Sequence, residues 1–467
     1  MPYRCVVASL RETNPFAPFA TFCSKTHPPH PPPKFPTHTQ LVKPQPPHPC
    51  AHLIETGEYW TSRQRQAAPL HEISYRACFK PQLPAYFITR HTTPGDLVYD
   101  PFAGRGTTAI EAALLGRRVA INDINPLTRI LTEPRLELPS PAAIRARLDT
   151  LAPLLAANDT PPTRNKKLET RNSDLLAFYS PRTLRHIHAL RAYLHERRAT
   201  ATEDAADRWL RMVATNRLTG HSPGFFSVYT LPPNQAASPK RQLEINRQRN
   251  QTPPERDILA LIWKKTLQLH TELTPAQIAN LHAAARTAQY FTVPAGNAEF
   301  SLGKNAKKNL GAPRDTSAPL LATRYPLLAT ASVSLTITSP PFLDTVQYAA
   351  DNWLRCWFNH IDPAAIANQI TTPRTLEAWD AFIRPVFREL HRITRPGGHV
   401  AFEVGEIRKG TIRLEETVVP AAETAGFTCQ KILINEQTFT KTANIWGVTN
   451  NTRGTNTNRI VLLQKPK

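Results

Sequence analysis

Hydrophobic positions in the first third of the chain follow the spacing of a βαβ unit. Residues 96–100 (DLVYD) have the pattern of a short buried strand, and residues 107–115 (TTAIEAALL) have helical spacing. Gly116 stands where a helix-ending glycine belongs, and residues 119–122 (VAIN) have the pattern of a second strand. Strand, glycine turn, helix and strand in this order predict a parallel sheet.

The middle of the chain has a different pattern. Residues from about 140 to 290 are rich in Ala, Leu and Arg with helical periodicity, as in 184–194, and a basic loop rich in Pro, Asn and Gly is expected near 219–255. Strand signals return at alternate positions in 333–337 and in 400–404. We therefore expect an α/β fold in which one doubly wound, Rossmann-like sheet is interrupted by a helical insertion.

These patterns divide the chain into four predicted parts. Residues 1–55 contain ten prolines between positions 28 and 49, mixed with histidines, and we expect a disordered Pro/His-rich tail there. The histidines have no metal-ligand spacing, so no metal is expected. Residues 56–139 and 291–467 are expected to form the two halves of the sheet domain, with the helical insertion at 140–290 between them.

Charge and cysteine content narrow the class of protein. The formal net charge is +21 in 467 residues, which favours a polyanionic partner such as nucleic acid. No run of 18 or more apolar residues occurs, so no membrane association is expected. None of the six cysteines belongs to a C-x-x-C pair, so a disulfide framework or a zinc site is not indicated, and a reducing cytoplasm is the expected compartment.

A glycine-rich segment follows the first predicted strand. In residues 100–108 (DPFAGRGTT), Gly104 and Gly106 let the backbone approach a ligand closely, and the helix start offers free N–H groups. Asp123, 19 residues after Gly104, can accept hydrogen bonds from both hydroxyls of a ribose. Gly104, Gly106 and Ala109 also satisfy a dinucleotide-binding fingerprint, so this segment alone leaves a dehydrogenase open.

A second segment follows the strand at 333–337. In residues 336–342 (TITSPPF), two consecutive prolines make the chain leave the sheet stiffly, with Ser339 and the carbonyl of Pro340 held in place and the Phe342 ring beside them. Acceptors for both protons of an exocyclic amine would steer its nitrogen toward sp³ geometry and free its lone pair. The Phe342 ring could stack on a base taken out of a duplex.

Together, the DPFAGRGTT and SPPF segments resemble the amino-methyltransferases of DNA, which modify adenine N6 or cytosine N4. The resemblance covers about residues 70–130 and 290–465. It implies S-adenosylmethionine as cofactor, bound by Asp100, Phe102, Ala103, Gly104, Gly106, Thr107 and Asp123, and catalysis by Ser339, Pro340, Pro341 and Phe342. A serine at the first position and a phenylalanine at the last favour the cytosine-N4 subgroup, with adenine N6 as the alternative.

Two further cofactor contacts are implied by the same resemblance. Lys80 and Pro81 precede the first strand, where the family has the start of a cofactor-side helix. Asn297 stands where the family usually has an acidic residue that accepts the adenine amino proton, and an amide oxygen accepts this bond less strongly than a carboxylate does.

The helical insertion is expected to contact the nucleic acid. The resemblance implies double-stranded DNA as substrate, a cognate restriction endonuclease as a further partner and association with the nucleoid. The expected phosphate or base contacts are basic residues of the insertion and of a polar C-terminal loop, namely Arg217, His221, Arg241, Arg247, Arg249, Lys441 and Arg453.

Rival functions make different demands on the sequence. A carbon-5 cytosine methyltransferase needs a Pro-Cys nucleophile on its catalytic loop, and the only Pro-Cys pair is at 49–50, in the predicted tail. A guanine-N2 RNA methyltransferase shares similar turns and stays an alternative. A non-enzymatic DNA-binding protein is the alternative from a different class, and it would not need both motifs at strand ends.

Overall fold

The computed structural model describes residues 40–42, 53–57, 59, 67–76, 78–159, 174–231, 236–296, 328–342, 348–371, 373–407, 412–436 and 457–467. Among these residues, no helix is both long and apolar enough to cross a membrane.

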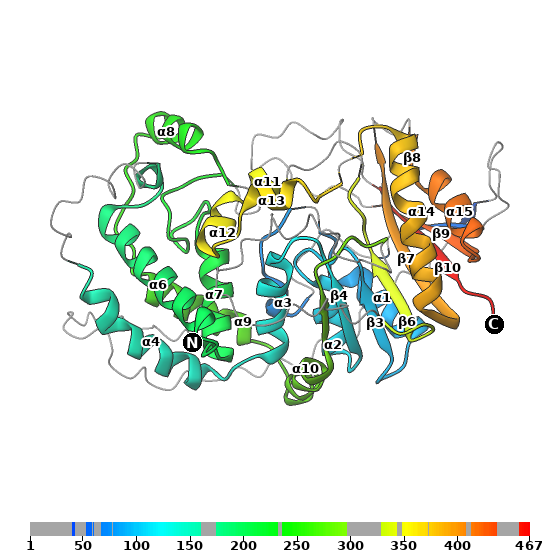
Figure 1. The fold of residues 1–467 in the computed structure, drawn as a ribbon, viewed down its shortest axis with the longest axis horizontal. Helices are drawn as coiled ribbons and strands as arrows, with labels where there is room; N and C mark the ends of the chain where they lie inside the picture. The colour runs from blue at the N-terminus through cyan, green and yellow to red at the C-terminus, as the bar shows by residue number, and fades with distance from the viewer. Residues whose placement is uncertain are drawn as a thin grey trace, which may run out of the picture. The chain divides into compact units, whose positions relative to one another are not determined.

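The described strands form one mixed sheet. Along its path they are ordered β1-β2-β9-β10-β7-β6-β3-β4-β5, with β8 paired to β7 (Figure 1). The strands are β1 (Gln40–Val42), β2 (Leu53–Gly57), β3 (Leu97–Asp100), β4 (Arg118–Asn122), β5 (Gln289–Phe291), β6 (Val333–Thr338), β7 (Thr394–Ile407), β8 (Ile412–Arg413), β9 (Thr428–Glu436) and β10 (Thr457–Gln464).

The centre of the sheet is parallel and buried. The neighbours β7, β6, β3, β4 and β5 all pair in parallel, whereas β10 runs antiparallel to both β7 and β9. Every residue of β3 and β6 is buried. β3 begins with the apolar run Leu97 to Tyr99, whereas in β6 apolar residues alternate with the buried hydroxyl residues Ser334, Thr336 and Thr338.

Helices cover both faces of the sheet. Val98 and Ala401 pack in one hydrophobic core, together with residues of α1 and α2. Their neighbours Tyr99 and Phe402 point to the other face and pack in a second core with residues of α14 and α15. Figure 1 shows α14 and α15 beside β7, β9 and β10. The doubly wound α/β fold predicted from the sequence is therefore confirmed.

The helices in chain order are α1 (Gln82–His91), α2 (Thr107–Leu114), α3 (Leu127–Glu137), α4 (Pro141–Ala156), α6 (Pro181–Ala199), α7 (Ala205–Arg217), α8 (Pro239–Gln248), α9 (Ile258–His270), α10 (Pro275–Thr287), α11 (Tyr348–Asp351), α12 (Trp353–Phe358), α13 (Pro363–Ala367), α14 (Leu376–Ile393) and α15 (Glu415–Thr424). Short 3-10 helices span Pro69–His71 (η2) and Leu175–Ala177 (η3). The helices from α4 to α10 all lie between β4 and β5 in the chain.

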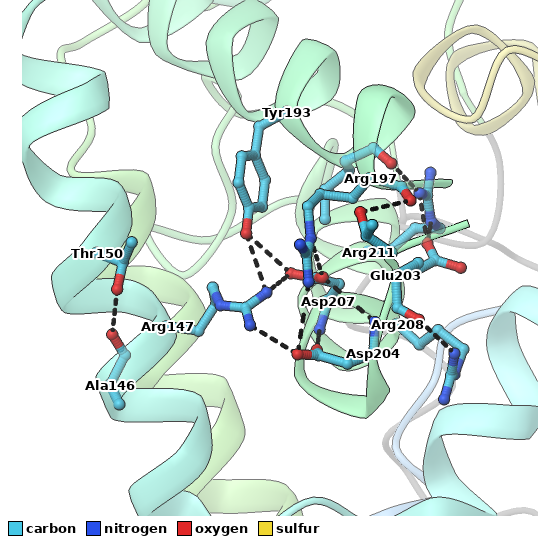
Figure 2. Close-up of polar contacts among 12 residues, drawn as sticks. Ala146, Arg147, Thr150, Tyr193, Arg197, Glu203, Asp204, Asp207, Arg208 and Arg211 are labelled. Carbon is cyan, nitrogen blue, oxygen red and sulfur yellow. Dashed lines mark hydrogen bonds and ion pairs between the residues drawn. The ribbon is translucent and has the colours of Figure 1, made fainter. Parts of the chain in front are cut away.

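A buried charge cluster joins three of these helices. Asp207 at the start of α7 is fully buried and accepts hydrogen bonds from Arg147 of α4 and from Tyr193 and Arg197 of α6, the last at 2.8 Å (Figure 2). Arg147 also pairs with Asp204 at 2.6 Å, and Asp204 caps α7 reciprocally with Asp207. Because two guanidinium groups share one buried carboxylate, the cluster fixes the relative positions of α4, α6 and α7.

Two segments differ from the sequence-based expectation. The segment expected to be a tail contains β1 and β2, and β2 pairs in parallel with β9 near the other end of the chain. The basic segment expected as a loop near 219–255 contains the helix α8, capped by Ser238 and begun by Pro239. Pairing with a distant strand leaves no local signal, and the buried face of α8 carries amides that a hydrophobic pattern does not register.

Candidate functional site

The strands β3 and β6 meet where the sheet changes its winding direction. From β3 the chain proceeds through β4 to β5, whereas from β6 it proceeds through β7 in the opposite direction. The hydroxyl of Thr338, at the end of β6, donates a 2.7 Å hydrogen bond to Asp100, at the end of β3. The hydroxyl of Thr108 on α2 donates to the carbonyl of Ile337 at 3.2 Å. Crevices beyond such a switch point are where open α/β sheets bind ligands.

A cavity of about 480 Å³ lies at this point. Both predicted segments line it, the first through Phe102 and Gly104 and the second through Ser339 and Pro341, and Asp123 lines it as well. This volume is within the range of small-molecule and cofactor sites. Residues far apart in sequence thus share one cavity.

Other predicted site residues belong to the same turns but are not among the residues that line the cavity. Ala103, whose N–H donates to the Asn122 carbonyl, and Thr107, whose hydroxyl accepts from Arg105 at 3.0 Å, are buried in the turn and helix start. Pro340 is buried, and neither it nor Phe342 is among the residues that line the described cavity.

Asp123 holds the glycine turn in place. One of its oxygens accepts the backbone N–H of Gly104 at 2.7 Å and the other accepts the N–H of Asn125 at 2.9 Å. Burial raises the pKa of Asp123, while these two backbone hydrogen bonds act in the opposite direction. Each carboxylate oxygen has a second lone pair, so Asp123 can still accept hydroxyl protons from a ligand in the cavity.

Gly106 is required by space as well as by backbone conformation. Its φ is +76°, and a Cβ there would overlap the side chain of Thr132 on α3. Gly106 has a left-handed backbone conformation and is the N-cap of α2, so the helix starts immediately after the turn. The glycine turn therefore depends on the contact between α2 and α3.

Asp100 lies beneath the turn and is fully enclosed. Its Oδ1 accepts from Thr338 and from the N–H of Phe102, whereas Oδ2 has no hydrogen-bond partner among the described residues. Burial raises the pKa of Asp100 to about 7. This carboxyl is therefore sensitive to any charge placed in the cavity nearby.

Ser339 is connected to a buried carboxyl group that the sequence interpretation missed. Glu403 on β7 is buried and accepts hydrogen bonds from the Ser339 hydroxyl and from the Asn458 side-chain amide on β10. Burial, together with the nearby charge of Asp100, raises the pKa of Glu403 to about 7. A proton acceptor that titrates near neutrality thus contacts the hydroxyl at the cavity wall.

The remainder of the SPPF turn is fixed by neighbouring elements. The indole N–H of Trp379 on α14 donates to the carbonyl of Pro341 at 2.9 Å. The Phe342 ring is half-buried against Gly405 on β7, where a Cβ would lie 3.5 Å from the ring. Phe342 therefore packs beside the cavity, next to the strand that carries Glu403.

Asn122 at the end of β4 positions the opposite wall of the cavity. Its amide donates to the carbonyls of Pro101 at 3.1 Å and Val293 at 3.0 Å, and its oxygen accepts the N–H of Val293. The segment from Val293 to Gly296 lines the cavity as a result. Asn297, the predicted acceptor that follows this segment, lies outside the described residues.

Lys80 and Pro81 are placed at the start of α1, with Pro81 as its N-cap, and are not among the residues that line the described cavity. From the region before α1, it is Tyr75 that lines the cavity, and its hydroxyl accepts from Asn125 at 3.3 Å. Arg105 of the glycine turn is held by the carbonyls of Ile73 and Phe79.

The predicted nucleic-acid contacts fall into three groups: residues next to aromatic rings, residues exposed on α8, and residues outside the described part of the chain. Arg217 stacks on Phe225 at 4.1 Å, its pKa lowered to about 10 by burial, and the half-buried His221 ring lies 6.3 Å from the same Phe225 ring. Arg241 and Arg247 are exposed on α8. Arg249 folds onto Tyr229 at 3.7 Å. Lys441 and Arg453 lie outside the described residues.

Sequence interpretation also missed the α14 side of the cavity. Phe382 lies 5.9 Å from Phe102 between ring centres, and Ile370 and Pro385 complete this apolar wall. An aromatic residue on an amphipathic helix gives no separate signal of a binding role, because the same pattern is expected for core packing. Within the part of the chain that the structure describes, no group of three or more His, Cys, Asp and Glu side chains could hold a metal ion.

Comparison with known proteins gives partial matches to DNA methylases. Residues 22–129 match the model of a DNA methylase family. This match includes β3, the glycine turn, α2, β4 and Asp123. A stretch of 77 residues is 35% identical to the type II methyltransferase M.MjaII of Methanocaldococcus jannaschii, covering 16% of this chain and 14% of that protein. The chain thus matches about one seventh of that curated relative's length.

Solved structures include methyltransferases of several kinds. A DNA modification methylase described as putative, from Thermus thermophilus, is 21% identical over 30% of this chain and 47% of that one, with a TM-score of 0.18. The rRNA methyltransferase aviRa of Streptomyces viridochromogenes is 11% identical over 85% of this chain and 90% of that one, with a TM-score of 0.30. The fold assignment rests on the strand order and on the helices covering both faces of the sheet.

Proposed function

We propose that the protein is an S-adenosylmethionine-dependent methyltransferase acting on the exocyclic amine of a DNA base, with cytosine N4 as the preferred position. The observation that carries the proposal is that Gly104 and Ser339, more than 200 residues apart, line one cavity at the switch point. The match of residues 22–129 to a DNA methylase family supports the choice of reaction and substrate.

The cavity fits the cofactor in size and in the chemistry of its walls. Asp123 offers acceptors for ribose hydroxyls, and the rings of Phe102 and Phe382 offer apolar surface for a flat base. The backbone at Gly104 allows close approach, and Asp100 provides a buried carboxyl beneath the turn. When bound, the cofactor supplies an electrophilic methyl group on a sulfonium sulfur.

The residues on the β6 side would prepare the acceptor amine. The Ser339 hydroxyl and the Pro340 carbonyl would accept its two protons, which favours sp³ geometry at the nitrogen. Phe342 would stack on the extruded base. Ionised Glu403 would hold the Ser339 hydroxyl through its own hydrogen bond and, by proton transfer through that hydroxyl, accept the proton that the amine loses when it gains the methyl group. Positioning and electrostatics therefore supply most of the rate.

The choice of cytosine N4 depends on the serine and phenylalanine of the SPPF turn. Adenine N6 of DNA is the second candidate, because the matched family model covers DNA methylases without separating the two bases. Double-stranded DNA would be the partner, in the cytoplasm at the nucleoid, and a restriction endonuclease of the same specificity would complete a restriction–modification pair.

The test is to incubate the full chain with S-adenosylmethionine carrying a labelled methyl group and either duplex DNA or structured RNA, and to identify the modified nucleoside by mass spectrometry. Labelled N4-methyldeoxycytidine is the expected product. Labelled N6-methyldeoxyadenosine would support the proposed reaction but show that the methylated base is adenine. Label only in RNA guanosine, or in no nucleoside, would overturn the proposal.

A further inference from the structure

The helix α8 is attached to the protein by hydrogen bonds along one face. Ile245 on this face is buried, but its neighbours are amides. Gln242 donates to the carbonyl of Tyr229 at 3.0 Å, and Asn246 donates to the carbonyl of Ala177 at 2.8 Å. Since these bonds have fixed geometry, they set the rotation of α8 about its own axis more strictly than apolar contacts would. The opposite face is therefore presented in a defined orientation.

The segment leading into α8 is joined to the region that follows the SPPF turn. The N–H of Ala236 donates to the carbonyl of Asp351 at 3.1 Å, and the indole of Trp353 donates to the carbonyl of Ala237 at 3.1 Å. Asp351 ends α11, the first described element after Phe342. Ile370, shortly after α13, lines the cavity. The base of α8 is thus connected to elements that border the candidate active site.

The outward face of α8 is polar and basic. The polar side chains on this face are those of Lys240, Arg241, Glu244, Arg247 and Gln248, and all but the half-buried Glu244 are exposed. The same side of the helix also exposes one large apolar residue, Leu243. Arg241 pairs with Glu244 at 2.8 Å. The side chains of Arg247 and Gln248 make no hydrogen bond or ion pair to any residue that the structure describes. Figure 1 shows α8 at the outer edge of the helical group, above α6 and α7.

These side-chain types match the hydrogen-bonding edges of DNA bases. Arginine pairs with the two acceptors of guanine, glutamine with adenine, and glutamate accepts from the cytosine amino group, all in the major groove. A single α-helix fits that groove. On the same helix, Lys240 near the start would contact phosphate, which positions the helix without reading sequence.

We propose that α8 is the recognition helix of the protein and that Arg247 and Gln248 read base edges in the major groove of double-stranded DNA. The proposal rests on the proposed function for its choice of partner and adds the element that determines sequence specificity. It separates Arg247, which makes no ring contact among the described residues, from Arg217 and from the exposed Arg249, whose guanidinium groups are stacked on Phe225 and Tyr229 and so have a packing role.

The test is selection from a pool of duplexes with a randomised segment, using the full chain and then sequencing the bound DNA. The wild-type protein is expected to enrich one sequence, and Arg247→Ala to lose preference at one position by about 10-fold, since a bidentate base contact discriminates by that order. Gln248→Ala is expected to relax a neighbouring position. Arg198→Ala is the matched control, because it removes another exposed arginine, at the end of α6.

The outcomes separate this proposal from the proposed function. If Arg247→Ala and Gln248→Ala both enrich the wild-type sequence unchanged, or if the wild-type protein enriches none, α8 is not a recognition helix. If the variants change the enriched sequence while the wild-type protein transfers no methyl group to any nucleoside, the recognition helix stands and the methyltransferase proposal fails. Circular dichroism and melting temperature confirm that the variants are folded.

Discussion

The hydroxyl of Thr338 donates a 2.7 Å hydrogen bond to the carboxyl of Asp100, and this bond joins the ends of two neighbouring parallel strands. The residues that follow each strand form the two sides of one cavity, with Gly104 on one side and Ser339 on the other. Asp100 is buried with its pKa raised to about 7. A contact in the core of the protein therefore fixes the position of the glycine turn, proposed to bind the cofactor, relative to the SPPF turn, proposed to bind the acceptor amine.

The first prediction concerns Asp123. Asp123→Ala removes the carboxylate that lines the cavity and holds the N–H of Gly104. We expect S-adenosylmethionine to bind about 10- to 100-fold more weakly, as for loss of hydrogen bonds to a charged group. Isothermal titration calorimetry measures the affinity. Asp96→Ala is the control, because Asp96 precedes β3, at the end of the strand opposite to the cavity. An equal loss of affinity in Asp96→Ala would contradict a specific role of Asp123.

The second prediction concerns the glycine turn. Gly106→Ala places a Cβ against the Thr132 side chain at a φ of +76°, so both overlap and backbone strain oppose folding. We expect the free energy of unfolding to fall by about 2–5 kcal/mol. Gly95→Ala has a φ of +87° but open space around the Cβ, and is expected to cost about 1–2 kcal/mol. Urea denaturation compares the two.

A double variant isolates the overlap from the strain. Gly106→Ala combined with Thr132→Ala removes the hydroxyl and methyl groups that a Cβ at position 106 would meet. We expect the double variant to recover part of the lost free energy of unfolding. Additive losses in the double variant would contradict the proposed contact between the glycine turn and α3.

The third prediction concerns pH. The pKa of Glu403 is raised to about 7, so its carboxyl is mostly protonated at pH 6 and ionised at pH 8. Because the ionised form accepts the Ser339 hydrogen bond more strongly, we expect the single-turnover methyl-transfer rate to rise with pH through about 7. Glu403→Gln should transfer slowly, with no such rise. An unchanged midpoint and amplitude in Glu403→Gln would show that another group titrates.

The ionisation of Glu403 also makes the free energy of unfolding depend on pH, in a direction that follows from its raised pKa. Its pKa is higher in the folded chain than the ordinary value of 4.5, so the folded protein binds this proton more tightly than the unfolded chain does. The contribution of Glu403 to the free energy of unfolding is therefore greatest below pH 4.5 and falls as the pH rises through about 7. Denaturation at several pH values should show a smaller fall for Glu403→Gln than for the wild-type protein.

The fourth prediction concerns the charge cluster of Figure 2. Asp207→Ala leaves Arg147 and Arg197 without their buried carboxylate, and we expect a loss of about 3–5 kcal/mol in the free energy of unfolding. Asp149→Ala removes an exposed ion pair with Arg145 on α4 and should cost less than about 0.5 kcal/mol. Similar losses for both variants would show that the cluster adds little beyond a surface pair.

The local parts of the fold and site could be predicted from sequence. The strand expected at 96–100 is β3 at Leu97–Asp100, and the helix expected at 107–115 is α2 at Thr107–Leu114. Their signals lie within a few residues, since a buried parallel strand and a helix each have their own hydrophobic period. The positions of Ser339 and Gly104 at strand ends also followed from these patterns.

The remaining features depend on contacts between distant residues. Glu403 has the appearance of an ordinary polar position in β7, and only the pairing of β7 with β6 and β10 places it beside Ser339 and Asn458. The Asn122 amide contacts Val293, 171 residues away. α8 was expected as a loop because its buried positions are amides bound to backbone carbonyls. None of these relationships has a local pattern in the sequence.

The most direct test of the account measures two quantities on Ser339→Ala, namely its affinity for S-adenosylmethionine and its single-turnover rate of methyl transfer to duplex DNA. The account predicts an unchanged affinity, because Asp123 and the glycine turn remain, and a transfer rate lower by about 100-fold or more, as when a positioned proton acceptor is removed. Transfer at the wild-type rate would contradict the claim that the amine is held at the end of β6.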